Sequence, residues 1–256
     1  MEQTEKKLET LGRLRTNEEV FILFSKCTNM PYVYCDPETY NDQIYVYEQE
    51  TDAREGAKRL IEGKIQPVQV VRLKKEQFLS FYSSLYLAGI NAMVVNDGTD
   101  RELEIQLEEL VRRPDYTNLP KDKVKVENPQ LHLTALYFMQ MLRKGEKPEL
   151  TQELKELEEE MMVNLRKGTF VVPVQEDRKV PFMKMKNGDS YQPIFTDVAE
   201  FNKFNIKKEF RGAVVPFANL YKILIEQSKG FVINPLGFHL VVVREQVTPV
   251  NPKTEA

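Results

Sequence analysis

The chain has 256 residues, and its 36 Lys and Arg residues nearly balance 39 Asp and Glu residues, which gives a net charge of -3. This balance, without a long basic run, predicts that neither duplex nucleic acid nor an anionic membrane is a partner. The charged N-terminal stretch lacks the apolar core of a signal peptide, and no later stretch is apolar enough to span a membrane, so we expect a cytoplasmic protein. In that compartment Cys27 and Cys35, the two cysteines, are expected to stay reduced.

The first half of the chain alternates short strand patterns with helical patterns. Period-2 alternation and flanking turn residues predict strands at 20–24, 31–35, 43–47, 68–73 and 92–96. Apolar residues at helical spacing predict a helix from about Asp52 and another over 74–89, which stops at Gly89. The segment 101–110 fits either a strand or a short charged helix on its own pattern.

The second half repeats this order, and the repeat is the strongest organisational signal in the sequence. Strands are predicted at 169–174, 180–186, 191–195, 212–217, 231–234 and 238–245, and helices over 197–204 and 217–230. The register places "MPYVYC" on "VPFMKM", Gln43 on Gln192, and the strand before Asn96 on the strand before Asn234. Because the second copy ends with a strand, the repeat favours a strand for "ELEIQL" within 101–110.

Two helical patterns, 131–145 and 149–168, lie between the copies and are separated at Gly145 and Pro148, where a helix must stop or kink. We interpret them as a helical hairpin that connects two domains, with a partner-binding arm as the alternative. The predicted organisation comprises a charged N-terminal segment (1–16), a first repeat (17–112), a loop and helical linker (113–166), a second repeat (167–247) and a flexible C-terminal tail (248–256). Each repeat reads β-β-β-α-β-α-β-β, so the predicted fold class is α/β, with an α+β mixed sheet in two tandem units.

The second copy carries the strings "GTFVVPV", "VPFMKMKNGDSYQPIFTD", "FRGAVVPFANL" and "GFVINPLGFHLVV" in this order. They resemble the SseB family of enhanced serine sensitivity proteins, in which "lPlFTs", a helix and "glviNP" recur. The resemblance places Phe195, Thr196, Asn234 and Pro235 at family positions, and it extends to the first copy more weakly, through the repeat. It implies a fold and a bacterial cytoplasmic setting, without an agreed enzymatic activity.

The first copy departs from the family strings at two places. It has Asn96-Asp97-Gly98 where the second copy has Asn234-Pro235, and "IYVYEQ" in place of "PIFTD". We therefore expect that only one copy retains whatever role those positions have.

The sequence assembles no recognisable catalytic or metal site. A nucleophilic Cys35 needs a histidine base, and the two histidines, His132 and His239, lie in the linker and on the last strand of the other copy. The cysteines lack the spacing of a zinc site, the acidic residues of the first hairpin lack the pattern of a calcium loop, and no Gly-rich phosphate loop occurs. We therefore predict no catalytic residue, no metal and no cofactor.

Tyrosines concentrate on the first hairpin, with Tyr32 and Tyr34 on one strand and Tyr45 on the next. We expect them to pack across the strands, with a protein-binding face as the functional alternative. Asn96 and Asn234 end equivalent strands, where an asparagine is typical of a turn and also of a ligand-facing position at a strand end.

We expect a non-catalytic tandem module that acts through an unknown protein partner as a cytoplasmic adaptor. The alternative is a sensor for an amino acid or related metabolite, with its pocket between the repeats or at the strand ends. The candidate ligand-binding or partner-binding residues are Tyr32, Tyr34, Asn96, Phe195, Thr196, Asn234 and Pro235. The pattern gives neither the oligomeric state nor the relative orientation of the repeats.

Overall fold

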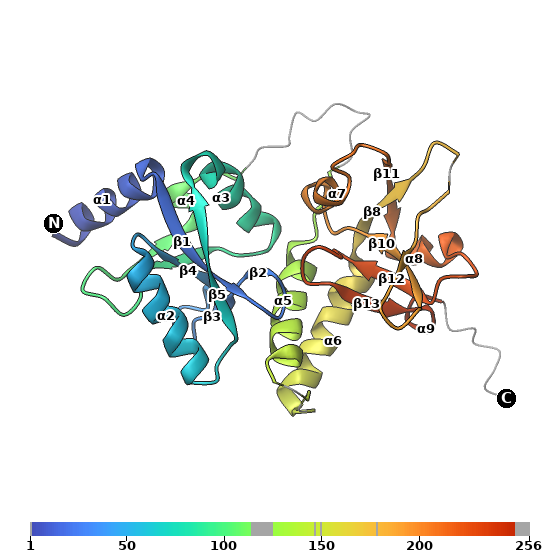
Figure 1. Ribbon diagram of the computed structural model, residues 1–256, viewed down its shortest axis with the longest axis horizontal. Coiled ribbons are helices and arrows are strands. Elements are labelled where there is room, and N and C mark those ends of the chain that lie inside the picture. Colours follow the sequence, from blue (N-terminus) through green and yellow to red (C-terminus); the bar gives the residue numbers. More distant parts are fainter. Residues whose placement is uncertain (1, 114–124, 146, 149, 178, 249–256) are drawn as a thin grey trace. The chain divides into compact units, whose positions relative to one another are not determined.

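The computed structural model describes residues 2–113, 125–145, 147–148, 150–177 and 179–248 (Figure 1). The chain divides into two compact units, each of which takes in part of the segment between the predicted repeats. Unit 1 comprises Met1–Asn118 and His132–Glu158, and unit 2 comprises Leu119–Leu131 and Glu159–Ala256.

Unit 1 is built on a seven-stranded mixed sheet with helices. Its elements are α1 (Glu2–Thr16), β1 (Glu19–Ser25), β2 (Met30–Pro31), β3 (Val33–Cys35), β4 (Asp42–Tyr47), α2 (Glu50–Glu62), β5 (Val68–Lys74), η1 (Lys75–Gln77), α3 (Phe78–Leu87), β6 (Ala92–Val95), β7 (Leu103–Gln106) and α4 (Leu107–Leu110). The strand order is β2-β1-β4-β6-β7, with β5 on the free side of β1 and β3 on β4. The β4–β6 pair is parallel and the others are antiparallel. The strand expected within 101–110 is confirmed as β7.

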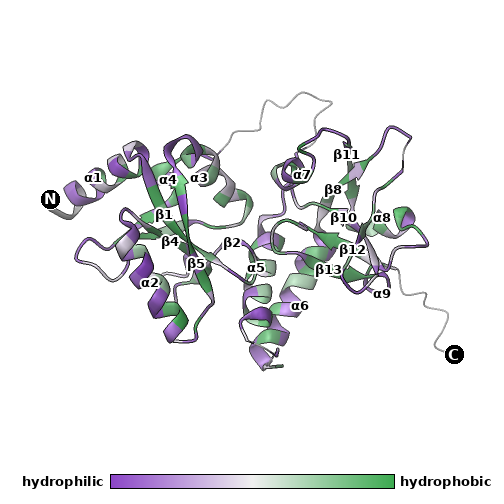
Figure 2. Ribbon diagram, in the orientation of Figure 1, coloured by the Kyte–Doolittle hydropathy of each residue, from purple (hydrophilic) through white to green (hydrophobic). Residues whose placement is uncertain are grey.

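Helix α2 packs on one face of this sheet through small residues. Ala53, Ala57 and Leu60 join the strand residue Tyr47 in one buried cluster. Gly56 is required at the centre of the contact, because a Cβ there would lie 2.1 Å from the Tyr47 hydroxyl oxygen. Figure 2 shows apolar residues concentrated in the strands, whereas α2 carries hydrophilic residues along much of its length. The helix thus buries a narrow stripe and exposes the rest.

Unit 2 contains a four-stranded sheet and a two-stranded sheet. Its elements after the shared helices are β8 (Thr169–Val174), β9 (Met183–Lys184), β10 (Ser190–Ile194), α7 (Val198–Phe204), β11 (Arg211–Pro216), α8 (Phe217–Leu220), η2 (Tyr221–Ile223), β12 (Gly230–Ile233), β13 (Leu240–Val243) and α9 (Arg244–Val247). One sheet runs β13-β12-β10-β9 and the other is β11-β8. A bridge between Val171 and Phe195 connects them, and the β10–β12 pair is parallel.

Two further helices come between α4 and β8 along the chain. Helix α5 (Pro129–Arg143) begins in unit 2 and continues in unit 1, and α6 (Gln152–Lys167) begins in unit 1 and ends in unit 2. Within unit 1, the Gln140 side chain of α5 bonds both backbone groups of Val33, accepting from its N–H at 3.0 Å and donating to its C=O at 2.8 Å. This amide covers the open edge of β3 as a neighbouring strand would. Helix α6 directly precedes β8, just as α1 directly precedes β1.

The mixed α/β class predicted from the sequence is confirmed, and the two units have the same strand order. Equivalent hydrogen bonds fix their register: the Asn96 N–H donates to Val46 O and the Asn234 N–H donates to Ile194 O. Val46 therefore matches Ile194, and Glu48 matches Thr196. The predicted pairing of Gln43 with Gln192 is wrong by one residue, since Ile44 occupies the position of Gln192.

Three element boundaries also differ from the predictions. The helix expected over 217–230 ends at Ile223. Its continuation is intercepted by the buried Gln192 side chain, which donates to Ile223 O at 3.0 Å and accepts from the Ile225 N–H at 2.8 Å. The strand expected over 238–245 ends before Arg244, where α9 begins. The strand expected over 180–186 is reduced to the two-residue strand β9.

Candidate functional site

The carboxyl ends of the parallel strands β4 and β6 in unit 1 are joined by an asparagine clamp. The Asn96 side chain accepts a hydrogen bond from the Glu48 backbone N–H at 2.9 Å and donates to Glu48 Oε2 at 2.8 Å. Asn96 is fully buried and has a φ of 55°, in the left-handed region that asparagine tolerates better than most residues. The clamp therefore fixes the turn after β6 to the residue that follows β4.

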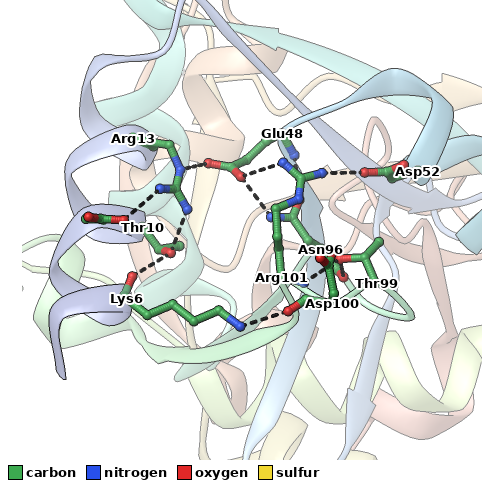
Figure 3. Close-up of polar contacts among 10 residues, drawn as sticks. Lys6, Thr10, Arg13, Glu48, Asp52, Asn96, Thr99, Asp100 and Arg101 are labelled. Carbon is green, nitrogen blue, oxygen red and sulfur yellow. Dashed lines mark hydrogen bonds and ion pairs between the residues drawn. The ribbon is translucent and has the colours of Figure 1, made fainter. Parts of the chain in front are cut away.

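Glu48 is also a buried carboxylate at the centre of an ion network (Figure 3). Its side chain is 3% exposed, and Oε1 lies 2.5 Å from Arg13 Nε of helix α1. Arg101 bridges two carboxylates, with Nη1 3.6 Å from Glu48 Oε2 and Nη2 2.8 Å from Asp52 Oδ2. Two arginines compensate the buried carboxylate, so the loss of both would leave a costly unpaired charge. The network ties α1, the start of α2 and the β6–β7 loop to the strand ends.

The equivalent corner of unit 2 has a threonine hydroxyl, in place of a carboxylate, beside its own asparagine. Asn234 accepts from the Thr196 N–H at 3.0 Å and donates to Thr196 Oγ1 at 2.8 Å. The Thr196 hydroxyl in turn donates to Asp197 Oδ2 at 2.8 Å, and Asp197 Oδ1 accepts from the Glu200 N–H as the N-cap of α7. Asn234 again has a positive φ, of 47°. The clamp is thus common to both units, while the side chain it holds is Glu48 in one and Thr196 in the other.

Most of the candidate residues predicted in the second repeat are buried at this corner. Phe195, Thr196 and Asn234 are buried, and the Phe195 ring packs edge-on against Phe201 of α7 at 5.7 Å between centroids. Pro235 is partly exposed, and its carbonyl oxygen lies 3.2 Å from His239 Nδ1. The amides of Asn96 and Asn234 both bond groups of their own chain.

The tyrosines of the first hairpin form a stack in unit 1, as the cross-strand expectation requires. The Tyr34 and Tyr45 rings lie 5.0 Å apart at 11°, and Tyr32 lies 6.1 Å from Tyr45 at 17°. Tyr34 and Tyr45 are partly exposed, and the Gln43 amide donates to the Tyr34 hydroxyl at 2.8 Å. Burial raises the pKa of all three phenols, so they act as neutral hydroxyl groups near pH 7.

The environments of the two thiols disfavour the reactive thiolate form. Burial raises the pKa of Cys27, and burial with the nearby Asp42 and Asp36 raises the pKa of Cys35. Activated cysteines have a lowered pKa. Within the part of the chain that the structure describes, no three His, Cys, Asp or Glu side chains are grouped as metal ligands, and no helix there is both long and apolar enough to cross a bilayer.

A surface hollow of about 400 Å³ lies in unit 1, apart from these residues. Its walls come from the ends of α2 and α5 and the start of α6, and include Lys64, Lys144 and Lys147. None of the candidate residues predicted from the sequence lines it.

The edge strands of the two units differ in a way that sequence reasoning missed. On β5, Arg72 pairs with Phe21 of β1, and on β11, Val214 pairs with the equivalent Val171 of β8. At the other edge, Glu104 of β7 and Val241 of β13 hold equivalent positions. A position-by-position comparison of the repeats would have revealed these charged-to-valine differences.

Part of the chain is similar to a known protein family. Residues 149–248, from α6 to α9, match the family model described as SseB protein N-terminal domain, which confirms the SseB resemblance for this part. No curated protein matches the chain. Among solved structures, the chain is similar to Tic22 from Plasmodium falciparum, at 15% identity over 93% of each chain with a TM-score of 0.22. It is also similar to Anabaena Tic22 (protein transport), at 7% identity over 81% of each chain with a TM-score of 0.23.

Proposed function

We propose that the protein is a non-catalytic module of two SseB-like units that binds a partner protein, and that unit 2 receives an extended segment of that partner along the edge of β11. In this mode the peptide adds a strand to a sheet and gains affinity from backbone hydrogen bonds. The observation that carries the proposal is the edge of β11, where the exposed Val214 stands at the position that Arg72 holds in unit 1.

The outer edge of β11 offers free backbone groups. Val171 of β8 exchanges both of its backbone hydrogen bonds with Phe195, so the residues beside it on β8 turn theirs toward β11. Antiparallel pairing then directs the backbone groups of Ala213 and Val215 toward β8, and those of Gly212 and Val214 outward. Among the described residues, β8 is the one strand that pairs with β11.

The corresponding edge of unit 1 is protected by charge. Arg72 of β5 lies 3.5 Å from Glu19 and 3.5 Å from Glu50, so charged side chains flank the outward backbone groups. Natural edge strands commonly use charges to prevent unwanted pairing. Val214, at the equivalent position, is 41% exposed and carries no such protection. Unit 2 therefore presents the edge that is suited to pairing.

Charges beside β11 indicate the chemistry of the partner segment. Lys207, Lys208 and Arg211 are exposed at the start of the strand and form no ion pair with any described residue. Val214 supplies an apolar contact farther along the strand. The segment that fits is extended, with an apolar side chain against Val214 and an acidic side chain toward the cationic end. This arrangement favours a protein partner over the metabolite alternative, because Asn96 and Asn234 are engaged within the chain.

The test is a selection of short randomised displayed peptides on the immobilised full-length protein, with counter-selection on the Val214→Arg variant. We expect peptides that alternate apolar residues and contain an acid, and at least a tenfold loss of affinity, about 1.4 kcal/mol, in Val214→Arg. The amides of Gly212 and Val214 should gain protection from hydrogen exchange when the peptide binds. Val241→Glu, which makes the equivalent exchange at the β13 edge, is the matched control and should bind normally.

Peptide binding that is insensitive to Val214→Arg, or protection that falls outside β11, would contradict the proposal. Methylation of single backbone nitrogens of a bound peptide provides a second criterion. Alternate positions should abolish binding, because alternate residues of an added strand face the protein edge. Uniform tolerance to methylation would exclude strand addition.

A further inference from the structure

One carboxylate of unit 2 is buried without a complete set of partners. Glu200 has a side chain that is 4% exposed, and its Oε1 lies 2.5 Å from Lys203 Nζ. Its Oε2 is inaccessible to solvent and has no hydrogen-bond partner. Buried polar atoms are nearly always paired in native proteins, so an orphan acceptor requires an explanation, such as an absent donor.

Unit 1 shows which donor holds the equivalent position. Gln49 and Asp197 are the N-cap residues of α2 and α7, so Asp52 and Glu200 occupy the same third position of their helices. Asp52 Oδ2 receives Arg101 Nη2 at 2.8 Å, as Figure 3 shows. The same guanidinium reaches Glu48, the counterpart of Thr196, at 3.6 Å. A planar cation thus bridges the residue after the strand and the first turn of the helix.

The chain supplies no such cation to unit 2 from the corresponding loop. Arg101 lies on the turn that links β6 to β7, whereas the turn that links β12 to β13 reads Pro-Leu-Gly-Phe-His over 235–239. Lys203 reaches the other oxygen of Glu200, so Oε2 is the acceptor left over. Unit 2 retains the carboxylate of this arrangement and lacks the arginine.

We propose that unit 2 binds the guanidinium group of a ligand at Glu200 Oε2, in the place that Arg101 holds in unit 1. A guanidinium is always charged and presents several N–H donors in one plane, which suits a carboxylate that has one oxygen already engaged. The Lys203 side chain is 49% exposed and reaches Glu200 Oε1. A ligand must displace the atoms that cover Oε2 to bond to it. The group could come from a small molecule such as arginine or from an arginine side chain of another protein. The inference does not depend on strand addition at β11.

The experiment is a nuclear magnetic resonance titration of the full-length protein with L-arginine, and with L-citrulline as the neutral isostere. A parallel arm uses a capped Gly-Arg-Gly peptide beside a capped Gly-citrulline-Gly peptide. We expect arginine compounds to shift the amide resonances of Glu200 and Lys203 in a saturable way, and the citrulline compounds to leave them unchanged. The Glu200→Gln variant should bind at least about tenfold more weakly. Glu209→Gln, an exposed neighbour in unit 2, should bind like the wild type.

The outcomes separate the sources of the group and decide the proposal. Binding of free arginine assigns a small-molecule ligand, and binding of the peptide alone assigns a protein side chain. Equal responses to arginine and citrulline, or arginine binding that survives Glu200→Gln, would overturn the site. A flat titration in both arms would overturn it as well, and would assign the orphan oxygen to an ordered water. If Glu200→Gln does not fold, Glu200→Asp, which keeps the charge and withdraws the oxygen, serves as the second variant.

Discussion

The two units solve the same structural problem with different chemistry. Each must connect the ends of two parallel strands, and each does so with a buried asparagine at positive φ, Asn96 in unit 1 and Asn234 in unit 2. The group that the asparagine side chain holds then differs: Glu48 belongs to an ion network, whereas the Thr196 hydroxyl donates to the Asp197 carboxylate. The backbone requirement is common to the fold, and the side chain beside it is free to vary.

The two corners therefore differ in the structural elements that they connect. Glu48 draws in Arg13 from α1 and Arg101 from the β6–β7 turn, because a buried carboxylate must be compensated. Thr196 needs a single acceptor for its hydroxyl, which Asp197 provides. The Glu48 corner thus couples α1 and the β6–β7 turn to the strand ends, whereas the Thr196 hydroxyl bonds the next residue along the chain.

The largest expected effect tests the shared clamp. Asn96→Ala and Asn234→Ala each leave a buried backbone N–H without its acceptor and place alanine at positive φ, so each should lower the free energy of unfolding of its unit by about 3 kcal/mol. Urea titration followed by hydrogen exchange resolves the two units. Asn→Gly at each position is the control, since glycine removes the φ penalty and should recover about 1 kcal/mol. If Asn96→Ala lowers the free energy of unfolding more than twice as much as Asn234→Ala, the ion network contributes more to the stability of the unit 1 corner than the backbone clamp does.

The next effect distinguishes the Glu48 corner of unit 1 from the Thr196 corner of unit 2. Glu48→Gln leaves two arginines facing an amide and should cost about 2 kcal/mol. Thr196→Val removes the hydrogen bonds of an uncharged hydroxyl and should cost about 1 kcal/mol. Glu48→Gln should also reduce the exchange protection of α1, which Arg13 ties to this corner. In a double-mutant cycle, Arg13→Met should cost less in the Glu48→Gln background than in the wild type. Additive costs would argue against coupling between α1 and the corner.

The sequence was sufficient for the features that depend on local pattern. Alternation located the strands, and the repeat resolved β7, whose own pattern fitted both a strand and a helix. The two clamp asparagines were found by the same comparison, which favoured a turn and kept a ligand-facing role as the alternative. The positive φ and the bonds to Glu48 and Thr196 explain why an asparagine stands there.

Features that depend on distant residues were not accessible from pattern. Arg13, Glu48 and Arg101 are far apart in the sequence, so nothing in their spacing marks the ion network. The match of Gln43 to Gln192 relied on residue identity, and a shift of one residue in a strand moves a side chain to the opposite face. Gln192 then ends a predicted helix early through its bonds to Ile223 and Ile225, which helical periodicity cannot reveal.

Replacing Arg72 of unit 1 by valine, the residue at the equivalent position of unit 2, should change self-association more than the free energy of unfolding. Arg72→Val removes half-exposed ion pairs and should cost less than about 1 kcal/mol. It exposes an apolar edge in unit 1, so sedimentation velocity should detect self-association that increases with concentration. Arg72→Lys, which keeps the charge, is the control and should stay as dispersed as the wild type. If Arg72→Val and Arg72→Lys show the same degree of self-association, charge does not protect the β5 edge.

The smallest expected effect concerns the turns of the two hairpins. In unit 1, hydrogen bonds from Thr39, and from the Glu38 backbone, hold the pKa of Asp36 below its ordinary value. A lowered pKa means that the charged form stabilises the fold, so this contribution is present above about pH 4 and is lost as the pH falls through the folded-state pKa. At the turn of unit 2 the neutral Asn187 accepts the equivalent kind of bond, from the Asp189 N–H. Asp36→Asn should therefore remove the acid-dependent change in exchange protection of the β3–β4 hairpin while leaving the β9–β10 hairpin unaltered. A carbon-detected titration that places Asp36 at its ordinary pKa would mean that the turn holds the neutral and charged forms equally well.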